Sequence, residues 1–303
     1  MTLINSSLPC RLLCAAECSY GIQPNGPFQK RQPYYDNIGF LEDPAIITGG
    51  LDAIDAALVG LNPDGIIVAF RGTLPPIPPL TLAIVLDWIQ DFIDVPEQVT
   101  GFPGMIHSGF HAAIKSLWPE VLSRVQTFRA QQNTAKIYVT GHSKGGALAS
   151  LGAWLLLQTP NGSLKPTQAV TFASPHVGNV EFAKAYNAQL SQIRYENYLD
   201  LVPFVPPEIE FLSLLEKIPE LGRQLAGADT WNYAPVGALR YITKDGAIEP
   251  DHAGLGAKRL AEILIDMLTG RVAEVAFAHS LVTYPLGYCR SVCTEDLCQG
   301  VIR

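Results

Sequence analysis

The chain has 303 residues, of which 48% are hydrophobic and only 16% are charged, and its formal net charge is −7. The apolar share excludes a disordered chain, and the acidic balance leaves no basic surface for nucleic acid. The longest apolar runs, residues 145–157 and 80–86, are shorter than the roughly 20 residues of a membrane-spanning helix. We therefore expect a folded chain without a transmembrane segment, and its low share of charge needs another cause.

The first 20 residues do not have the pattern of a secretory signal. No basic region precedes an apolar core, and Arg11 interrupts the apolar stretch. Without a signal the default location is the cytoplasm, whereas disulfides would indicate a secreted protein.

Six cysteines gather at the two ends of the chain. The first three are spaced by four residues, which puts them on one face of a helix. Three interpretations stay open: free thiols packed as small apolar side chains, disulfides between the two ends, or zinc ligands, although a C-x₂-C pair is missing. The cysteines are Cys10, Cys14, Cys18, Cys289, Cys293 and Cys298.

The pattern along the chain predicts alternating strands and helices. Between residues 110 and 200 this alternation favours a parallel sheet, and the absence of a linker favours one domain over 1–303. The predicted elements are a hairpin of 56–61 and 66–70, a helix over 110–128 kinked or restarted at Pro119, a strand over 137–140, a helix over 147–158, strands over 168–172 and 193–198, a hairpin that begins at 238–243, and a helix over 258–268.

The strand over 137–140 leads directly into Gly141-His142-Ser143-Lys144-Gly145-Gly146, and an apolar helix follows. This is G-x-S-x-G in the strand–turn–helix context of a nucleophile elbow. The turn is so tight that the serine is strained and the glycines on either side must lack side chains. Ser143 is then exposed at the end of the sheet, where N–H groups of the helix can bind an oxyanion.

A serine nucleophile needs a base, and the base needs an orienting acid. On this type of fold the chain order is serine, acid, histidine. Asp200 follows the strand over 193–198, and ligands bind open α/β sheets at the carboxyl ends of strands. The pattern leaves two candidates for the base, His279 near the chain end and His252 at the start of a helix.

Seven segments together resemble the class 3, fungal lipase-like family of α/β-hydrolases. They occur in the family's order between about residues 65 and 284. They are 68–73 (VAFRGT), 87–92 (DWIQDF), 106–110 (IHSGF), 139–143 (VTGHS), 171–179 (TFASPHVGN), 198–207 (YLDLVPFVPP) and 279–284 (HSLVTY).

This resemblance implies an α/β-hydrolase fold, a mostly parallel central sheet flanked by helices. It implies Ser143 as nucleophile, Asp200 as acid and His279 as base, with no cofactor and no metal. It also implies an oxyanion hole formed by the backbone N–H of Lys144 and by Thr73, and it brings Tyr20 near the pocket.

The chain departs from the family at three places. Residues 74–86 are uncharged and proline-rich, and they are a candidate lid. Residues 208–251 are a long insertion and a candidate cap. Lys144 stands where many members have leucine, and we expect it to be a solvated charge or part of a local ion pair.

The expected activity is hydrolysis of acylglycerols or other carboxylic esters at a lipid–water interface, through an acyl-enzyme on Ser143. The alternatives are a phospholipase or acyltransferase on the same triad, or a non-catalytic lipid-binding protein. A serine peptidase fits the elbow, but no feature favours an amide substrate. Apolar segments over a lipid-binding pocket would account for part of the low charge.

The resemblance also bears on the cysteines. In several secreted members a disulfide ties the N-terminal helix to the segment after the histidine. On that basis any disulfide ladder is expected to be antiparallel: Cys18–Cys289, Cys14–Cys293 and Cys10–Cys298.

Overall fold

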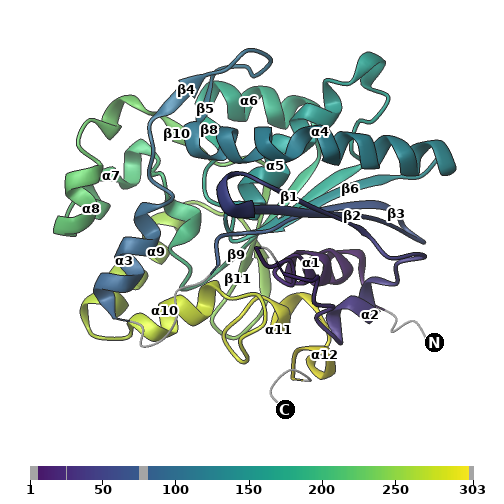
Figure 1. Cartoon of the computed structure of the whole chain (residues 1–303). Helices are drawn as coiled ribbons and strands as arrows, with labels where there is room; N and C mark the ends of the chain where they lie inside the picture. The colour runs from purple at the N-terminus through teal and green to yellow at the C-terminus, as the bar shows by residue number, and fades with distance from the viewer. Residues whose placement is uncertain (1–5, 25, 75–80, 300–303) are drawn as a thin grey trace.

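The computed structural model describes residues 6–24, 26–74 and 81–299 and shows a central sheet with helices on both faces (Figure 1). The sheet has the order β1-β2-β3-β6-β7-β9-β11-β12. Its strands pair in parallel from β3 to β11, and β1, β2 and β12 are antiparallel at the edges. The predicted mostly parallel sheet is therefore confirmed. The strands are β1 (Ala45–Gly49), β2 (Asp55–Asn62), β3 (Gly65–Phe70), β6 (Ile137–His142), β7 (Gln168–Phe172), β9 (Gln192–Asn197), β11 (Ala238–Ile242) and β12 (Ile248–Pro250).

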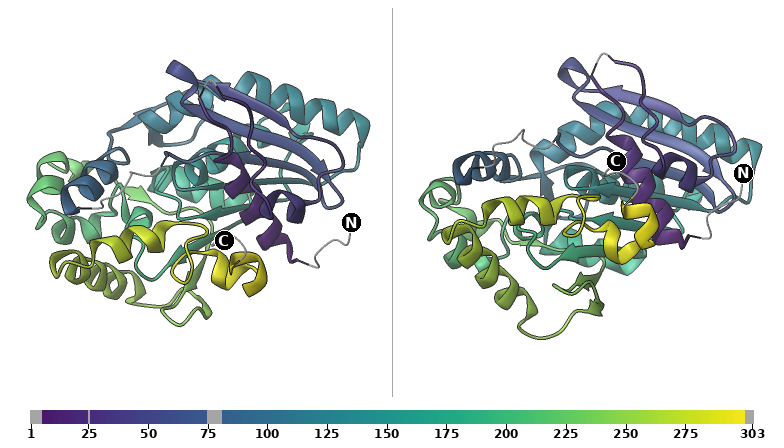
Figure 2. Two further views of the ribbon diagram at one scale, coloured as in Figure 1. Left: turned by 60° about the horizontal axis from the view of Figure 1, so that its bottom comes forward. Right: turned by 90° about the horizontal axis from the view of Figure 1, so that it is seen from below.

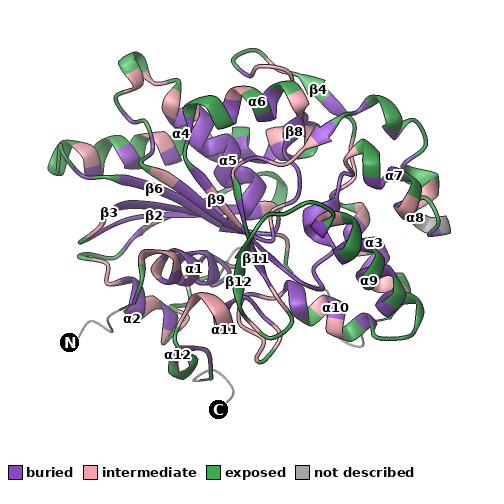
Figure 3. Ribbon diagram, turned by 180° about the vertical axis from the view of Figure 1, so that it is seen from behind, coloured by how far each residue is buried: buried purple, intermediate pink, exposed green. Residues whose placement is uncertain are grey.

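Two groups of helices cover the two faces of this sheet. On one face, α4 (Ser108–Gln131) packs on β1 to β3, and α5 (Lys144–Leu157) packs on β3, β6 and β7. On the other face, α1 (Leu8–Ser19) packs on β3 and β6 and is flanked by α2 (Tyr34–Ile38). The central strands β2, β3, β6 and β7 and most of α1 and α5 are buried (Figure 3), because both faces of this part of the sheet are covered. No helix in the described part of the chain is long and apolar enough to cross a membrane.

The remaining elements lie around the ends of the sheet. A second, small sheet has the order β10-β8-β5-β4. The helices α3, α7, α8, α9 and α10 gather beside the carboxyl ends of the central strands (Figure 1). These elements are β4 (Pro96–Gln98), β5 (Met105–His107), β8 (Gly178–Asn179), β10 (Tyr233–Ala234), α3 (Leu82–Gln90), α6 (Val180–Gln189), α7 (Ile209–Leu215), α8 (Pro219–Gln224), α9 (Leu255–Leu268), α10 (Val272–His279), α11 (Cys289–Val292) and α12 (Glu295–Gln299).

The helix that contains Pro119 is longer and more continuous than predicted. A restart at Pro119 is wrong, because α4 runs unbroken over 24 residues. An interior proline costs a helix about 3 kcal/mol. Apolar side chains on both sides of Pro119, from Phe110 to Phe128, are buried in the same core and offset that cost.

The predicted cap region, 208–251, divides into two parts. Its first part contains α7 and α8, which lie outside the central sheet, and its last part contains β11 and β12, which belong to it. The predicted lid, 74–86, overlaps the start of α3, whereas residues 75–80 lie outside the described residues. A covering role for either segment stays a prediction.

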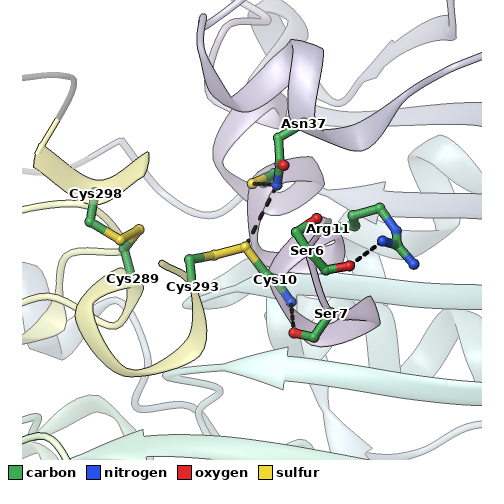
Figure 4. Close-up of a disulfide and its surroundings, with 9 residues drawn as sticks. Ser6, Ser7, Cys10, Arg11, Asn37, Cys289, Cys293 and Cys298 are labelled. Carbon is green, nitrogen blue, oxygen red and sulfur yellow. Dashed lines mark hydrogen bonds between the residues drawn. A yellow bond between two sulfur atoms is a disulfide. The ribbon is translucent and has the colours of Figure 1, made fainter. Parts of the chain in front are cut away.

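Two disulfides join cysteines at the ends of the chain, where α1 and α11 lie side by side (Figure 2). Cys10 pairs with Cys293, and Cys289 pairs with Cys298 (Figure 4). The expected three-bond pairing is wrong, as is the interpretation of six free thiols. The turn after α11 brings Cys293, and not Cys298, to the first turn of α1, and α12 folds back so that Cys298 reaches Cys289.

Cys14 and Cys18 remain free and buried deeper along α1. Burial raises the pKa of the Cys14 thiol to about 12 and that of Cys18 well above its ordinary value. Cys14 lies within 4.8 Å of both Cys10 and Cys293. A zinc site at these three cysteines is nevertheless wrong, because Cys10 and Cys293 are joined in a disulfide and so are not thiolate ligands.

Candidate active site

Ser143 occupies a strained turn between β6 and α5. Its φ of 58° and ψ of −133° lie in a region that L-residues rarely adopt. Its N–H donates to the carbonyl of Phe172 at 3.0 Å on the neighbouring strand, which fixes the turn against the sheet. The strained serine of a nucleophile elbow is thus present where the motif predicts it.

The glycines of the elbow are required by close backbone approaches. A Cβ on Gly141 would lie 2.0 Å from the carbonyl oxygen of Gly145, and one on Gly145 would lie 2.2 Å from that of Phe70. Both distances are far below contact distance, so neither residue tolerates a side chain without a backbone shift. The physical reason for the spacing of the motif is therefore visible in this turn.

His279 and Asp200 form a buried pair. Nδ1 of His279 donates to Oδ1 of Asp200 at 2.9 Å, and the two residues are 6% and 0% exposed. With the hydrogen on Nδ1, Nε2 of the neutral ring keeps its lone pair. Neither this Nε2 nor the Oγ of Ser143 has a hydrogen-bond partner within the described part of the chain.

Asp200 is held by two further donors. The N–H of Val202 donates to Oδ1 at 3.0 Å, and the hydroxyl of Tyr288 donates to Oδ2 at 2.5 Å. Tyr288 is fully buried, and its oxygen also accepts from the N–H of Asn197. The carboxylate is therefore fixed from both oxygens, as an orienting acid must be. The sequence pattern did not identify Tyr288.

A second pair of side chains braces the histidine from the other side. Nε2 of His142 donates to the main-chain carbonyl of His279 at 2.7 Å, because a carbonyl can only accept. Burial keeps the pKa of His142 well below its ordinary value, so the ring is neutral. Nδ1 then accepts from the hydroxyl of Tyr20 at 2.8 Å.

A cavity of about 320 Å³ opens beside this group. Tyr20, Thr73, His142 and His279 line it, as the resemblance implied for Tyr20. Trp88 of α3 also lines it, and its ring packs edge-on against that of His279 with the centroids 4.8 Å apart. Ser143 itself is 0% exposed and is not among the residues that line this cavity, whereas Trp88 of α3 covers the ring of His279.

Lys144 begins α5 and forms a local ion pair, which was one of its two expected roles. Its Nζ lies 2.6 Å from Oδ1 of Asp55, whose side chain is 6% exposed. The side chain therefore points to β2, and the backbone N–H at the first position of α5 has no acceptor within the helix. That N–H and Thr73 stay a predicted oxyanion hole.

The other histidines do not join the group. His252 is exposed and lines a separate cavity with His176. Of the two candidates for the base, His279 is the one that pairs with Asp200, and its role as base stays a prediction. His107 accepts from the N–H of Phe110 and caps the start of α4.

Part of the chain matches a known protein family. Residues 67–210 match the family described as Lipase (class 3). The matched region is 144 of the 303 residues, so just under half of the chain is similar to the class 3 lipases. Its central sheet and its structural neighbours also show the α/β-hydrolase fold.

Individual relatives match parts of the chain. A lipase of Caenorhabditis elegans is 32% identical over 111 residues, which are 36% of this chain and 31% of that protein. A chloroplastic phospholipase A1 of Arabidopsis thaliana is 29% identical over 217 residues, which are 62% of this chain and 40% of that protein. A solved triacylglycerol lipase, described as having a serine-protease triad as its catalytic centre, superposes with a TM-score of 0.57 at 25% identity over 79% of each chain. The chain spans less than half the length of these curated relatives.

Proposed function

We propose that the chain is a lipid ester hydrolase that uses Ser143, His279 and Asp200 as its catalytic triad. The observation that carries this proposal is the pairing of His279 Nδ1 with Asp200 while Nε2 stays unpaired next to the elbow. The family and the solved triacylglycerol lipase support the same chemistry.

Each residue has a defined role in the reaction. Nε2 of His279 takes the proton of Ser143 as Oγ attacks the ester carbonyl, and Asp200 stabilises the resulting imidazolium. The backbone N–H of Lys144 and Thr73 bind the oxyanion, and one such donor is worth about 3–4 kcal/mol. His279 returns the proton to the leaving alcohol, which leaves an acyl-serine. Water then attacks the acyl-serine by the same steps and releases the acid.

Access to the site requires α3 to move. Trp88 covers His279, and Val85 of the same helix lines the cavity. α3 also contacts α8 and α10, and its buried side chains, Val85, Leu86 and Ile89, are apolar. We propose that contact with a lipid surface displaces α3 and exposes this inner surface to lipid.

Phospholipid hydrolysis on the same triad is the second candidate, favoured by the phospholipase A1 that aligns with 62% of the chain.

The test combines a variant with a substrate series. Ser143→Ala is expected to lower kcat by several orders of magnitude on every ester, whereas near-normal turnover would refute the assignment. In the native protein, activity on an ester of increasing concentration is expected to rise sharply above its solubility limit. Smooth saturation with no such rise would contradict the displacement of α3.

A further inference from the structure

One wall of the active-site cavity contains a buried charged pair that the triad does not use. The side chain of Glu17 is 5% exposed, and Oε1 lies 2.8 Å from Nη2 of Arg31. Both residues line the cavity that His279 and Thr73 also line. Glu17 lies one turn before Tyr20 on α1, and the N–H of Tyr20 donates to the carbonyl of Glu17. The two side chains are therefore on the same side of the helix, toward the site.

The carboxylate of Glu17 is incompletely satisfied. No N–H or O–H group within the described residues donates to Oε1 with hydrogen-bond geometry, although the charge of Arg31 is adjacent. A buried carboxylate oxygen without a donor is costly. Oε1 itself is closed off from the cavity, so a ligand reaches this carboxylate at its other oxygen, Oε2, and Arg31, whose side chain is 40% exposed, can donate to the same ligand.

Other residues that line the cavity are apolar. They are Val85 and Trp88 of α3, Ala276 and Phe277 of α10, and Leu281 just after that helix. An ester that occupies this cavity can place an apolar part against these residues and a polar part against Glu17 and Arg31. The polar part must present an O–H donor to the carboxylate and an oxygen acceptor to the guanidinium.

We propose that Glu17 and Arg31 form a subsite for a free hydroxyl on the alcohol part of the substrate, so that partial acylglycerols are preferred over triacylglycerols. This inference rests on the proposed ester hydrolysis and adds its substrate class. A triacylglycerol has no hydroxyl, so it would bury the carboxylate without supplying a donor. A phosphatidylcholine also lacks an O–H donor, and its phosphate would lie against the negative charge of Glu17.

The size of the preference follows from the chemistry of such sites. A site that hydrogen-bonds a substrate hydroxyl discriminates against the analogue without it far more than an apolar pocket discriminates against an extra methylene. We expect a preference of about tenfold or more in kcat/KM for a diacylglycerol over the triacylglycerol with the same acyl chains. Burial raises the pKa of Glu17 to about 7, so assays at roughly pH 8.5 keep the carboxylate ionised and acceptor-only.

The experiment compares four esters presented in the same detergent micelles: a diacylglycerol, a triacylglycerol, a phosphatidylcholine with the same acyl chains, and a p-nitrophenyl ester. Glu17→Leu is expected to lower the diacylglycerol-to-triacylglycerol ratio of kcat/KM by about tenfold. Glu17→Gln, which keeps an acceptor oxygen, is expected to retain more of the ratio. The matched control is Asp64→Asn, because Asp64 pairs with Arg11 of the same helix at 2.6 Å but does not line the cavity.

The outcomes separate the subsite from the proposed function. If the native protein cleaves the p-nitrophenyl ester but shows no diacylglycerol preference, the subsite is refuted and the triad is not. If Glu17→Leu lowers the rates on all four esters by one factor, Glu17 has only a structural role and the subsite is refuted. A preference for phosphatidylcholine over diacylglycerol also refutes it. If the native protein cleaves none of the esters, the proposed function fails.

Discussion

The hydroxyl of Tyr288 is the most informative single group to remove, because it joins the acid of the triad to the backbone of β9. Tyr288→Phe keeps the ring, which is fully buried, and deletes only the oxygen. Asp200 then loses one of three donors, and the N–H of Asn197 loses its acceptor. A hydrogen bond to a charged group contributes about 1.5–3 kcal/mol, and a neutral one about 1 kcal/mol. We therefore expect a loss of about 3 kcal/mol in the free energy of unfolding.

The same deletion is expected to lower kcat. Without the Tyr288 hydroxyl, Asp200 is held less firmly. If the transition state loses as much stabilisation as the charged hydrogen bond contributes, kcat falls by about ten- to a hundredfold. The matched control is Tyr186→Phe, because Tyr186 is also fully buried and its hydroxyl donates to Gln192 at 2.6 Å, away from the triad. Urea unfolding gives the stability of both variants, and ester hydrolysis well below the unfolding midpoint gives kcat. A kcat for Tyr288→Phe equal to that of Tyr186→Phe would refute the positioning role.

Three further predictions concern the frame around the site. Lys144→Met leaves the buried carboxylate of Asp55 without its cation and should lower the free energy of unfolding in urea by about 2–4 kcal/mol. Adding Asp55→Asn should recover part of this loss. An unchanged urea midpoint for Lys144→Met would contradict a stabilising ion pair. Replacing Cys10 and Cys293 by alanine opens a loop of sequence separation 283, whereas replacing Cys289 and Cys298 opens one of 9. The chain-entropy relation predicts that the first replacement lowers the free energy of unfolding by about 3 kcal/mol more than the second. Equal urea midpoints for the two variants would contradict this. Burial lowers the pKa of His107 to about 4, so its contribution to stability is present above pH about 6.5 and is lost as pH falls to about 4. His107→Asn keeps a capping side chain. Between about pH 4 and 6.5 it should reduce the slope of the free energy of unfolding against pH by about 1.4 kcal/mol per pH unit. Parallel curves for the native protein and the variant would contradict this.

The parts of the site that lie on one local segment were predictable from the sequence. Gly141, Ser143 and Gly145 belong to a single tight turn. The close backbone approaches in this turn require the G-x-S-x-G spacing, so the motif predicts the turn. The strands on either side follow from short apolar runs, and β7 has the predicted bounds, 168–172. The position of Asp200 after β9 follows from the same logic.

Groups that meet only in three dimensions were not predictable in the same way. Tyr288 and Asp200 are 88 residues apart, and no periodicity relates them. Glu17 and Arg31 become partners only because the chain after α1 turns back, with the N–H of Gln29 donating to the carbonyl of Gly21. The predicted three-disulfide pairing was wrong for the same reason. Helical spacing shows which cysteines share a face of the helix, but it does not show which part of the C-terminal segment reaches them. For the base, the pattern left His252 open, and the resemblance chose His279.

The central claim is that Ser143 is a nucleophile activated by His279, and covalent labelling tests it most directly. A fluorophosphonate is expected to add once per chain, and peptide mass mapping is expected to place the adduct on Ser143. Ser143→Ala should take up no label, and His279→Gln should label far more slowly than the native protein. A native protein that takes up no label, or takes it up at another residue while its ester hydrolysis disappears, would contradict the account.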